Sequence, residues 1–274
     1  MLAADLAPGD AKCATINWDD FALHRITTRD DIWFETAFGM LWDEFGDRGE
    51  METREVLGRR MGWASSSRES GECLRYDLLL VTRNGQPIAV RDHTAIVIPH
   101  FSQAVVHMSH NLVLVPWRRS GIAGWLRALP VQIARSCMKS AGLPADHPVS
   151  LVAEMEAADP GDAARTTRLT AYEKAGYWKI DPSRINYLQP DFRPPDVIDA
   201  SGGPSPVPLC LLVRRVGKES EQSISGLQVR EIAEALYRMY AVEFRRQDMA
   251  PLFQSLTDYP SVDSNIRLVP PTAT

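Results

Sequence analysis

The segment RRSGIA, residues 118–123, places two arginines and a glycine where an apolar run ends and a helical pattern begins. The start of a helix leaves its first backbone N–H groups without acceptors and carries a partial positive charge, so it favours an anionic ligand. Glycine also lets the backbone of such a turn approach a bulky diphosphate. The segment therefore predicts an anion-binding turn; the alternative is a capped helix with two solvated arginines.

A second segment that could do chemistry is YEKAGY, residues 172–177, at the end of a predicted helix. The hydroxyl of Tyr172 could supply a proton to a departing group. The alternative is that its ring packs the last helical turn against a sheet.

Hydrophobic periodicity predicts the elements that must position these two segments. Asn84 and Gly85 indicate a tight hairpin, because both central positions of the favoured turn need positive φ. Pro130 is expected to kink or break the helix that follows RRSGIA. Strands are expected at 21–26, 74–82, 87–98, 104–115, 149–156 and 207–216, with a short one near 184–188. Helices are expected at 32–46, 51–61, 119–141, 163–176 and 227–246.

A hairpin followed by strand, helix, strand, helix and strand, together with RRSGIA and YEKAGY, resembles the GNAT superfamily of N-acetyltransferases. The two segments match signatures of that family, the first being its pyrophosphate-binding signature. The resemblance implies an α/β (α+β) fold with a mixed, mostly antiparallel central sheet flanked by helices, to which this sequence adds an extra C-terminal helix. We expect a flexible N-terminus at 1–15, a GNAT-like acyltransferase domain at 16–218, a C-terminal helical extension at 219–258 and a flexible tail at 259–274.

The resemblance also implies a reaction, the direct transfer of an acetyl group from the co-substrate acetyl-CoA to an amine of a small molecule or protein, without a metal. Tyr172 matches the tyrosine that protonates the departing thiolate in many members. The implied cofactor-binding positions are a strand end and the turn after it: Val113, Val115, Arg118, Arg119, Ser120, Gly121, Ile122 and Ala123. The alternative function is a non-catalytic acyl-CoA-binding or interaction module, because the strand glutamate of many members is missing here.

The sequence offers more than one candidate for the general base of this reaction. Counting back from RRSGIA places His107 where many members carry that glutamate, with Ser109 and His110 beside it, and histidine titrates near neutrality. Glu154 and Glu156 alternate onto one face of the next predicted strand and are alternative bases or acceptor-site carboxylates. The competing interpretations are a hydrogen-bonded structural histidine and surface carboxylates at a strand end.

Composition limits the partners. A formal charge of −5 and the lack of any Lys/Arg block argue against nucleic acid. The sequence has no signal-peptide pattern and no apolar run near the ~18 residues of a spanning helix, so we expect no membrane partner and a cytoplasmic location. The four scattered cysteines indicate neither a disulfide framework nor a zinc site, and the histidines lack metal-site spacing. The sequence leaves open whether the C-terminal helix packs on its own domain or forms a homodimer.

Overall fold

The computed structural model describes residues 5–7, 9–10, 17–46, 49–63 and 71–274. Contacts divide the chain into two compact units. The first comprises Met1–Pro99 and Val106–Asp146, and the second comprises His100–Val105 and His147–Thr274. The predicted domain boundaries after residues 15, 218 and 258 stay predictions.

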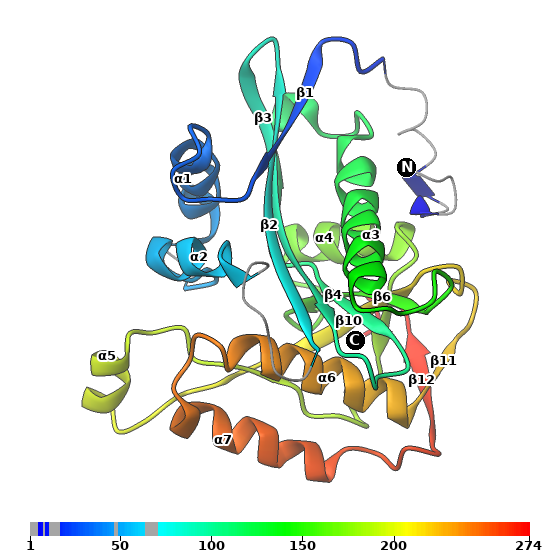
Figure 1. The fold of residues 1–274 in the computed structure, drawn as a ribbon. Helices are drawn as coiled ribbons and strands as arrows, with labels where there is room; N and C mark the ends of the chain where they lie inside the picture. Colours follow the sequence, from blue (N-terminus) through cyan, green and yellow to red (C-terminus); the bar gives the residue numbers. More distant parts are fainter. Residues whose placement is uncertain (1–4, 8, 11–16, 47–48, 64–70) are drawn as a thin grey trace. The chain divides into compact units, whose positions relative to one another are not determined.

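The first unit is built on a long antiparallel hairpin (Figure 1). Asn84 and Gly85 form its turn with φ angles of 49° and 76°, as the sequence predicts. A further strand pairs antiparallel with each arm of the hairpin, β1 with β2 and β5 with β3. The strands of this unit are β1 (Phe21–Ile26), β2 (Cys73–Arg83), β3 (Gln86–Val97) and β5 (Asn111–Val113).

Helices cover both faces of these strands, with α1 and α3 on opposite sides in Figure 1. Leu79 and Val81, two residues apart on one strand, pack with Ile122 and Leu126 of α3 in one apolar cluster. Pro130 lies inside α3 without ending it. The helical elements are α1 (Phe34–Phe45), α2 (Arg54–Arg60), the short 3-10 helix η5 (Val115–Trp117) and α3 (Ile122–Ser140).

The strands of the second unit pair in the order β6-β10-β7-β12-β11, and each neighbouring pair is antiparallel. β8 and β9 form a separate antiparallel pair, and β4 (Ala104–His107) passes from this unit into the first. The other strands are β6 (Val149–Met155), β7 (Trp178–Ile180), β8 (Leu188–Gln189), β9 (Val207–Pro208), β10 (Cys210–Arg215), β11 (Ser223–Ser225) and β12 (Asn265–Val269).

The second unit also contains the amphipathic helix predicted near the C-terminus, which is α6 (Gly226–Tyr240). Val229, Ile232 and Leu236 lie on its apolar stripe and are fully buried. The fold class is confirmed: helices pack on mostly antiparallel sheets in a mixed α/β chain. The helices of this unit are α4 (Ala163–Lys174), α5 (Pro195–Ala200), α6 (Gly226–Tyr240), α7 (Arg246–Ser255) and the short η6 (Leu256–Asp258).

The two segments that the sequence predicts to be flexible, 1–15 and 259–274, include residues whose contacts the structure describes. Within 259–274, β12 pairs with β7 and β11 and buries Ile266 and Leu268, so these residues are part of the sheet. Its alternation of apolar and polar residues is too short to be distinguished from a tail by pattern alone. Within 1–15, the structure describes 5–7 and 9–10, and there Asp5 and Asp10 are buried.

The two buried aspartates of the N-terminal segment contact α3. Asp5 forms an ion pair with Arg135 at 2.6 Å, and Asp10 pairs with Arg127, whose Nε donates to Asp10 Oδ2 at 3.1 Å. A buried carboxylate needs such a partner to offset its desolvation.

None of the helices in the described part of the chain has the length and apolar character needed to cross a membrane.

Candidate functional site

The predicted anion-binding turn joins η5 to α3 in the first unit. Arg119 and Gly121 have left-handed backbone conformations, with φ angles of 66° and 100°. Helix α3 starts at Ile122, and its N-cap residue, Gly121, has no side chain to accept a hydrogen bond from the first turn. The backbone N–H groups of Arg119, Gly121 and Ala123 have no acceptor among the described residues, and that of Ile122 reaches Ser120 Oγ only at 3.5 Å. The start of α3 therefore presents several free donors at the positive end of its dipole.

Two side chains of the turn bond back to its own backbone. Arg118 Nε donates to the carbonyl of Val113 at 3.1 Å, and Ser120 Oγ donates to that of Trp117 at 2.6 Å. Arg118 and Arg119 are both exposed, so their charges face solvent beside the free N–H groups. The turn is held in shape internally and keeps its positive charge outside.

The strand end before the turn holds the remaining predicted cofactor positions. Val113 is buried and lies opposite Ala89 in the β5–β3 ladder, whereas Val115 opens η5 with 69% of its surface exposed. Between them, the Leu114 N–H donates to the carbonyl of Ile88 at 3.0 Å. The predicted cofactor positions therefore extend from the end of β5 through η5 to the first residues of α3. Their role in binding stays a prediction.

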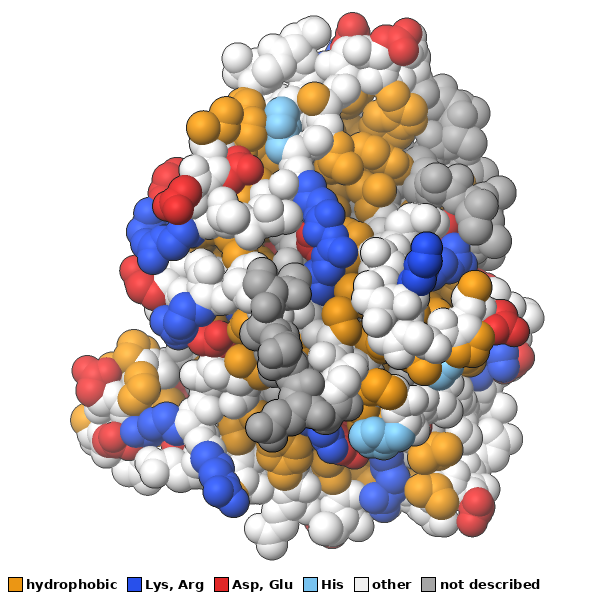
Figure 2. All heavy atoms as spheres, viewed as in Figure 1, with side chains coloured by type: hydrophobic (Ala, Val, Ile, Leu, Met, Phe, Trp, Pro, Cys, Tyr) orange, Lys and Arg blue, Asp and Glu red, His pale blue; other side chains and the backbone are white. Residues whose placement is uncertain are grey.

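Aromatic side chains border the turn, which sequence reasoning did not anticipate. The rings of Trp18 and Trp125 lie 4.6 Å apart, those of Phe21 and Trp117 6.0 Å apart, and the Arg83 guanidinium lies 5.0 Å from the Trp117 ring. Figure 2 shows apolar side chains gathered over β1 and the beginning of α3. The free N–H groups thus lie next to an aromatic surface.

His107, the candidate base of the first unit, is the last residue of β4. It is buried, and its Nδ1 lies 3.1 Å from Ser109 Oγ. The single strand predicted here is divided, because the His110 N–H donates to Asp92 Oδ1 at 2.7 Å and strand structure resumes only at Asn111. This break sets the path of the chain into the turn.

His110, in the break between β4 and β5, and Asp92, on β3, form a buried charged pair. His110 Nδ1 lies 3.0 Å from Asp92 Oδ1, its Nε2 lies 2.9 Å from the Glu50 carbonyl, and the Tyr76 hydroxyl donates to Asp92 Oδ2 at 3.1 Å. Burial opposes the charge on both partners. The carboxylate and the hydrogen bonds nevertheless raise the pKa of His110 to about 9, and the imidazolium and its bonds hold the pKa of Asp92 well below its usual range. The pair is therefore ionic at neutral pH.

A second buried polar group lies on the β2–β3 hairpin. Asp77 accepts hydrogen bonds from Arg25 and, at 3.0 Å, from Arg75, while burial raises its pKa to about 6. Opposite it, His93 is fully buried, and neither ring nitrogen has a hydrogen-bond partner in the part of the chain that the structure describes. Burial lowers the pKa of His93 to about 3. His93 is thus neutral near pH 7. The signal in the sequence that could have revealed this group is the presence of charged residues inside two apolar strands, in RYD (75–77) and RDH (91–93).

In the described part of the chain, no group of three or more His, Cys, Asp or Glu side chains is arranged to hold a metal ion. The predicted acid and the two glutamates belong to the second unit, whereas the turn and His107 belong to the first.

Tyr172 lies near the end of α4 with its ring against Tyr177, at 5.0 Å between centroids and 79° between planes. The residue is half-buried, and its hydroxyl has no hydrogen-bond partner among the described residues. Asp162 caps the same helix by accepting the Arg165 N–H at 2.8 Å. The ring is packed and the hydroxyl is available, so both interpretations of Tyr172 stay open.

Glu154 and Glu156 have different surroundings. β6 ends at Met155, so Glu156 lies beyond the strand and binds Arg165 and Arg168 of α4 at 3.1–3.2 Å. Glu154 lies inside the strand, and its two carboxylate oxygens each accept a hydrogen bond from a tyrosine hydroxyl at 2.6 Å. The tyrosines, residues 187 and 240, were missed by sequence reasoning because they are 33 and 86 residues away.

Comparison with known proteins gives structural neighbours only. No protein-family model matches the sequence, and no curated protein sequence matches it. Among solved structures, an aminoglycoside acetyltransferase from an uncultured soil metagenomic sample has 11% identity and a TM-score of 0.35, covering 57% of this chain and 89% of its own. A GNAT-family acetyltransferase from Streptococcus pneumoniae has 14% identity and a TM-score of 0.35, covering 72% and 99%.

A third structure is an aminoglycoside 6'-N-acetyltransferase complexed with coenzyme A, with 11% identity, a TM-score of 0.38 and coverage of 71% and 97%. The chain resembles GNAT acetyltransferases. At these identities and TM-scores the GNAT resemblance assigns no substrate and no catalytic residue to this chain.

Proposed function

We propose that this protein is an acyltransferase that moves an acetyl group from acetyl-CoA to an amine. The observation that carries the proposal is the turn before α3. It combines free N–H groups at Arg119, Gly121 and Ala123, a helix start and two exposed arginines. Such a cradle suits the pyrophosphate of coenzyme A.

In this reaction the amine nitrogen forms a bond to the thioester carbonyl carbon, and the carbon–sulfur bond breaks. The ammonium form of the acceptor first loses one proton to a base, the attacking nitrogen loses another as the amide forms, and the thiolate gains one. The balance is R–NH₃⁺ plus acetyl-CoA giving the N-acetyl product, CoA–SH and one released proton. We assign the thiolate proton to Tyr172, whose hydroxyl is available, and retain His107, Glu154 and Glu156 as candidate bases.

The proposal extends to setting and partners. We propose that the protein acts in the cytoplasm on acetyl-CoA and an amine acceptor; homodimer formation stays an open prediction.

The test is coenzyme A affinity, measured by calorimetry for wild type and for Gly121→Glu. The substitution adds a side chain, a left-handed strain and a negative charge where the diphosphate is expected, so binding should be lost. Gly142→Glu is the matched control, because Gly142 lies just after the other end of α3, is also left-handed at φ 72° and has open space around it. Unchanged affinity in a folded Gly121→Glu protein would contradict the assignment of the turn.

Turnover distinguishes the enzyme from the non-catalytic alternative. Wild-type protein incubated with acetyl-CoA and a broad amine panel should release free thiol and form acetylated products detectable by mass spectrometry. Coenzyme A binding without any product would favour an acyl-CoA-binding module instead.

A further inference from the structure

Two cysteine thiols of the first unit contact each other. Cys73 is the first residue of β2 and is half-buried, whereas Cys137 lies in the last turns of α3 and is buried. The two side chains share a hydrogen bond, and both are free thiols. The fold therefore brings together two cysteines that are widely separated in the sequence.

The contact follows from the way α3 packs along β2. Leu79 and Val81 of β2 meet Ile122 and Leu126 of α3 in one apolar cluster. Side chains alternate between the two faces of a strand, and the pairing of β2 with β3 is regular from Cys73 to Val81. Cys73 therefore lies on the same face of β2 as Leu79 and Val81, which is the face that α3 covers.

The position of Cys137 on α3 matches that of Cys73 on β2. Cys137 comes eleven residues after Leu126, about three helical turns, so both lie on one buried stripe of α3. At ~1.5 Å per helical residue, Cys137 is about 17 Å from Leu126. At ~3.3 Å per strand residue, Cys73 is about 20 Å from Leu79. The two thiols thus lie at similar distances from the apolar cluster and at the same end of the contact between helix and strand.

The two thiols differ in their access to a reagent. The hydrogen bond to Cys73, followed by burial, raises the pKa of the Cys137 thiol, so Cys137 stays protonated. Arg75, two residues along the same face of β2, places a positive charge near the pair, and positive charge favours the reactive thiolate. Asp77, which accepts a hydrogen bond from Arg75 at 3.0 Å, offsets part of this effect. Cys73 is half-buried and is therefore the thiol that a dissolved reagent reaches first.

We propose that Cys73 and Cys137 form a reversible disulfide site that responds to hydroperoxides. The Cys73 thiolate attacks the peroxide, so that the O–O bond breaks, an S–O bond forms and the leaving alkoxide takes up the thiol proton. The Cys137 sulfur then displaces hydroxide from this sulfenic acid, an S–S bond replaces the S–O bond, and the Cys137 proton leaves with the hydroxide as water. Two thiols and one hydroperoxide give one disulfide, one alcohol and one water.

Cys137 has a protective role in this scheme. A sulfenic acid that meets no second thiol is oxidised further to the sulfinic acid, which is not readily reversed. In the cytoplasmic setting proposed above, thiols are kept reduced, and the disulfides that form there are mostly transient or redox-sensing. The hydrogen-bonded dithiol is then the resting form and the disulfide its oxidised form. The inference is independent of acyl transfer, because it uses no residue of the anion-binding turn.

The test maps the products formed when the reduced protein is treated with a small excess of hydrogen peroxide. Remaining thiols are blocked with iodoacetamide, and the protein is digested without reductant. Mass spectrometry should find one cross-linked peptide pair, containing Cys73 and Cys137, which dithiothreitol separates.

Two serine variants show whether Cys137 is the resolving thiol. Cys137→Ser should lose the cross-link and accumulate the sulfinic acid at Cys73. Cys210→Ser is the matched control, because it also replaces a buried thiol, on β10 of the second unit. This control should form the cross-link at the wild-type yield.

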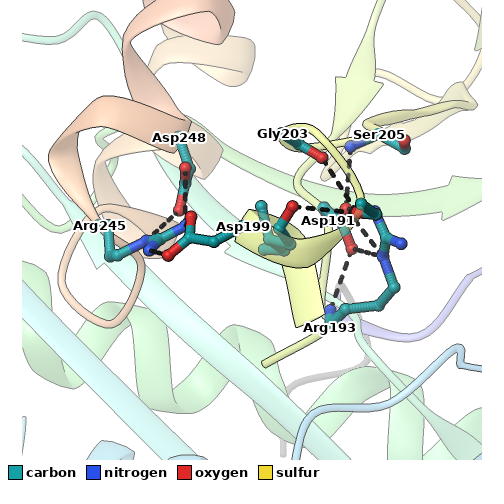
Figure 3. Close-up of polar contacts among 9 residues, drawn as sticks. Asp191, Arg193, Asp199, Gly203, Ser205, Arg245 and Asp248 are labelled. Carbon is teal, nitrogen blue, oxygen red and sulfur yellow. Dashed lines mark hydrogen bonds and ion pairs between the residues drawn. The ribbon is translucent and has the colours of Figure 1, made fainter. Parts of the chain in front are cut away.

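Hydrogen exchange tests whether the cross-link forms in the folded protein, and the second unit provides the reference segment (Figure 3). Asp191 there accepts two bonds from Arg193 Nε, at 2.9 and 3.0 Å, and one from the Ser205 N–H at 2.8 Å. Arg245 binds Asp199 at 2.8–2.9 Å. These contacts involve no cysteine, so exchange in this segment should be equal in the reduced and oxidised protein. Exchange at the start of β2 and the end of α3 should become slower on oxidation.

Three results would overturn the site. The first is a cross-link of Cys73 to Cys13 or to a second molecule in place of Cys137. The second is equal accumulation of the sulfinic acid at Cys73 in wild type and Cys137→Ser. The third is faster exchange along α3 in the oxidised protein, which would mean that the bond forms only when the helix has opened. If Cys137→Ser does not fold, the cross-link in folded wild type and Cys210→Ser decides the question.

Discussion

Replacing Asp92 by asparagine should make the stability of the protein less sensitive to alkali. In the wild type, Asp92 and the hydrogen bonds of the pair raise the pKa of His110 from its ordinary 6.5 to about 9, against the effect of burial. A pKa raised in the folded state contributes stability that is complete below pH 6.5 and disappears as the pH rises through about 9. The substitution removes the charge responsible for that contribution.

The magnitude follows from the two pKa values. Each pKa unit corresponds to about 1.4 kcal/mol, so the pair contributes roughly 3 kcal/mol to the free energy of unfolding near pH 6 and almost none near pH 10. Solvent does little to screen this energy, because His110 is only 8% exposed and Asp92 is fully buried. The stability difference between wild type and Asp92→Asn should therefore shrink by roughly 3 kcal/mol across this range.

Urea unfolding of both proteins at about pH 6 and about pH 10 measures this difference directly. Subtracting the variant from the wild type cancels the titration of other groups that the two proteins share. A difference that is the same at both pH values would refute the reasoning. If Asp92→Asn does not fold, an NMR titration of the His110 ring in the wild type, assigned with His110→Gln, must show an apparent pKa well above 6.5.

Three further predictions concern single side chains. Tyr172→Phe should fold normally and bind acetyl-CoA, and should lose kcat by about 10² to 10⁴ where thiolate departure limits the rate; a wild-type kcat would leave Tyr172 with packing alone. Gly226→Ala should cost about 1–3 kcal/mol in urea unfolding, because its Cβ would lie 2.0 Å from the Ser261 carbonyl oxygen, and an unchanged midpoint would contradict that geometry. Iodoacetamide should modify half-buried Cys73 before buried Cys137, whose thiol pKa is raised by the hydrogen bond to Cys73 and by burial; mass spectrometry of time points would reveal the reverse order.

Local signals in the sequence were sufficient to predict the elements that build the candidate turn. Asn84 and Gly85 specify a hairpin because few other residue pairs accept two positive φ angles. The apolar stripe in 227–246 predicted the amphipathic packing of α6, and the helix expected after RRSGIA is present as α3. Each of these features depends on residues close together in the chain.

The features that the sequence did not predict depend on distant partners. The division between β4 and β5 follows from a bond between the His110 backbone and Asp92, which is 18 residues away. The two tyrosines on Glu154 are farther still, and nothing in the pattern of β6 indicates them. Alternation predicted that Glu154 and Glu156 share one face of a strand. The pattern does not reveal that the strand ends at Met155, before Glu156.

The position of β12 has a consequence for synthesis on the ribosome. β12 follows β7 and β11 in the chain and yet lies between them in the sheet, so neither can gain this neighbour until residues 265–269 have emerged. Until then β7 has an unpaired edge on that side, and unpaired edges promote aggregation of incomplete chains. We expect ribosome-stalled chains that stop before residue 265 to be protease-sensitive throughout β7 and β11, and to become resistant in one step once β12 is exposed.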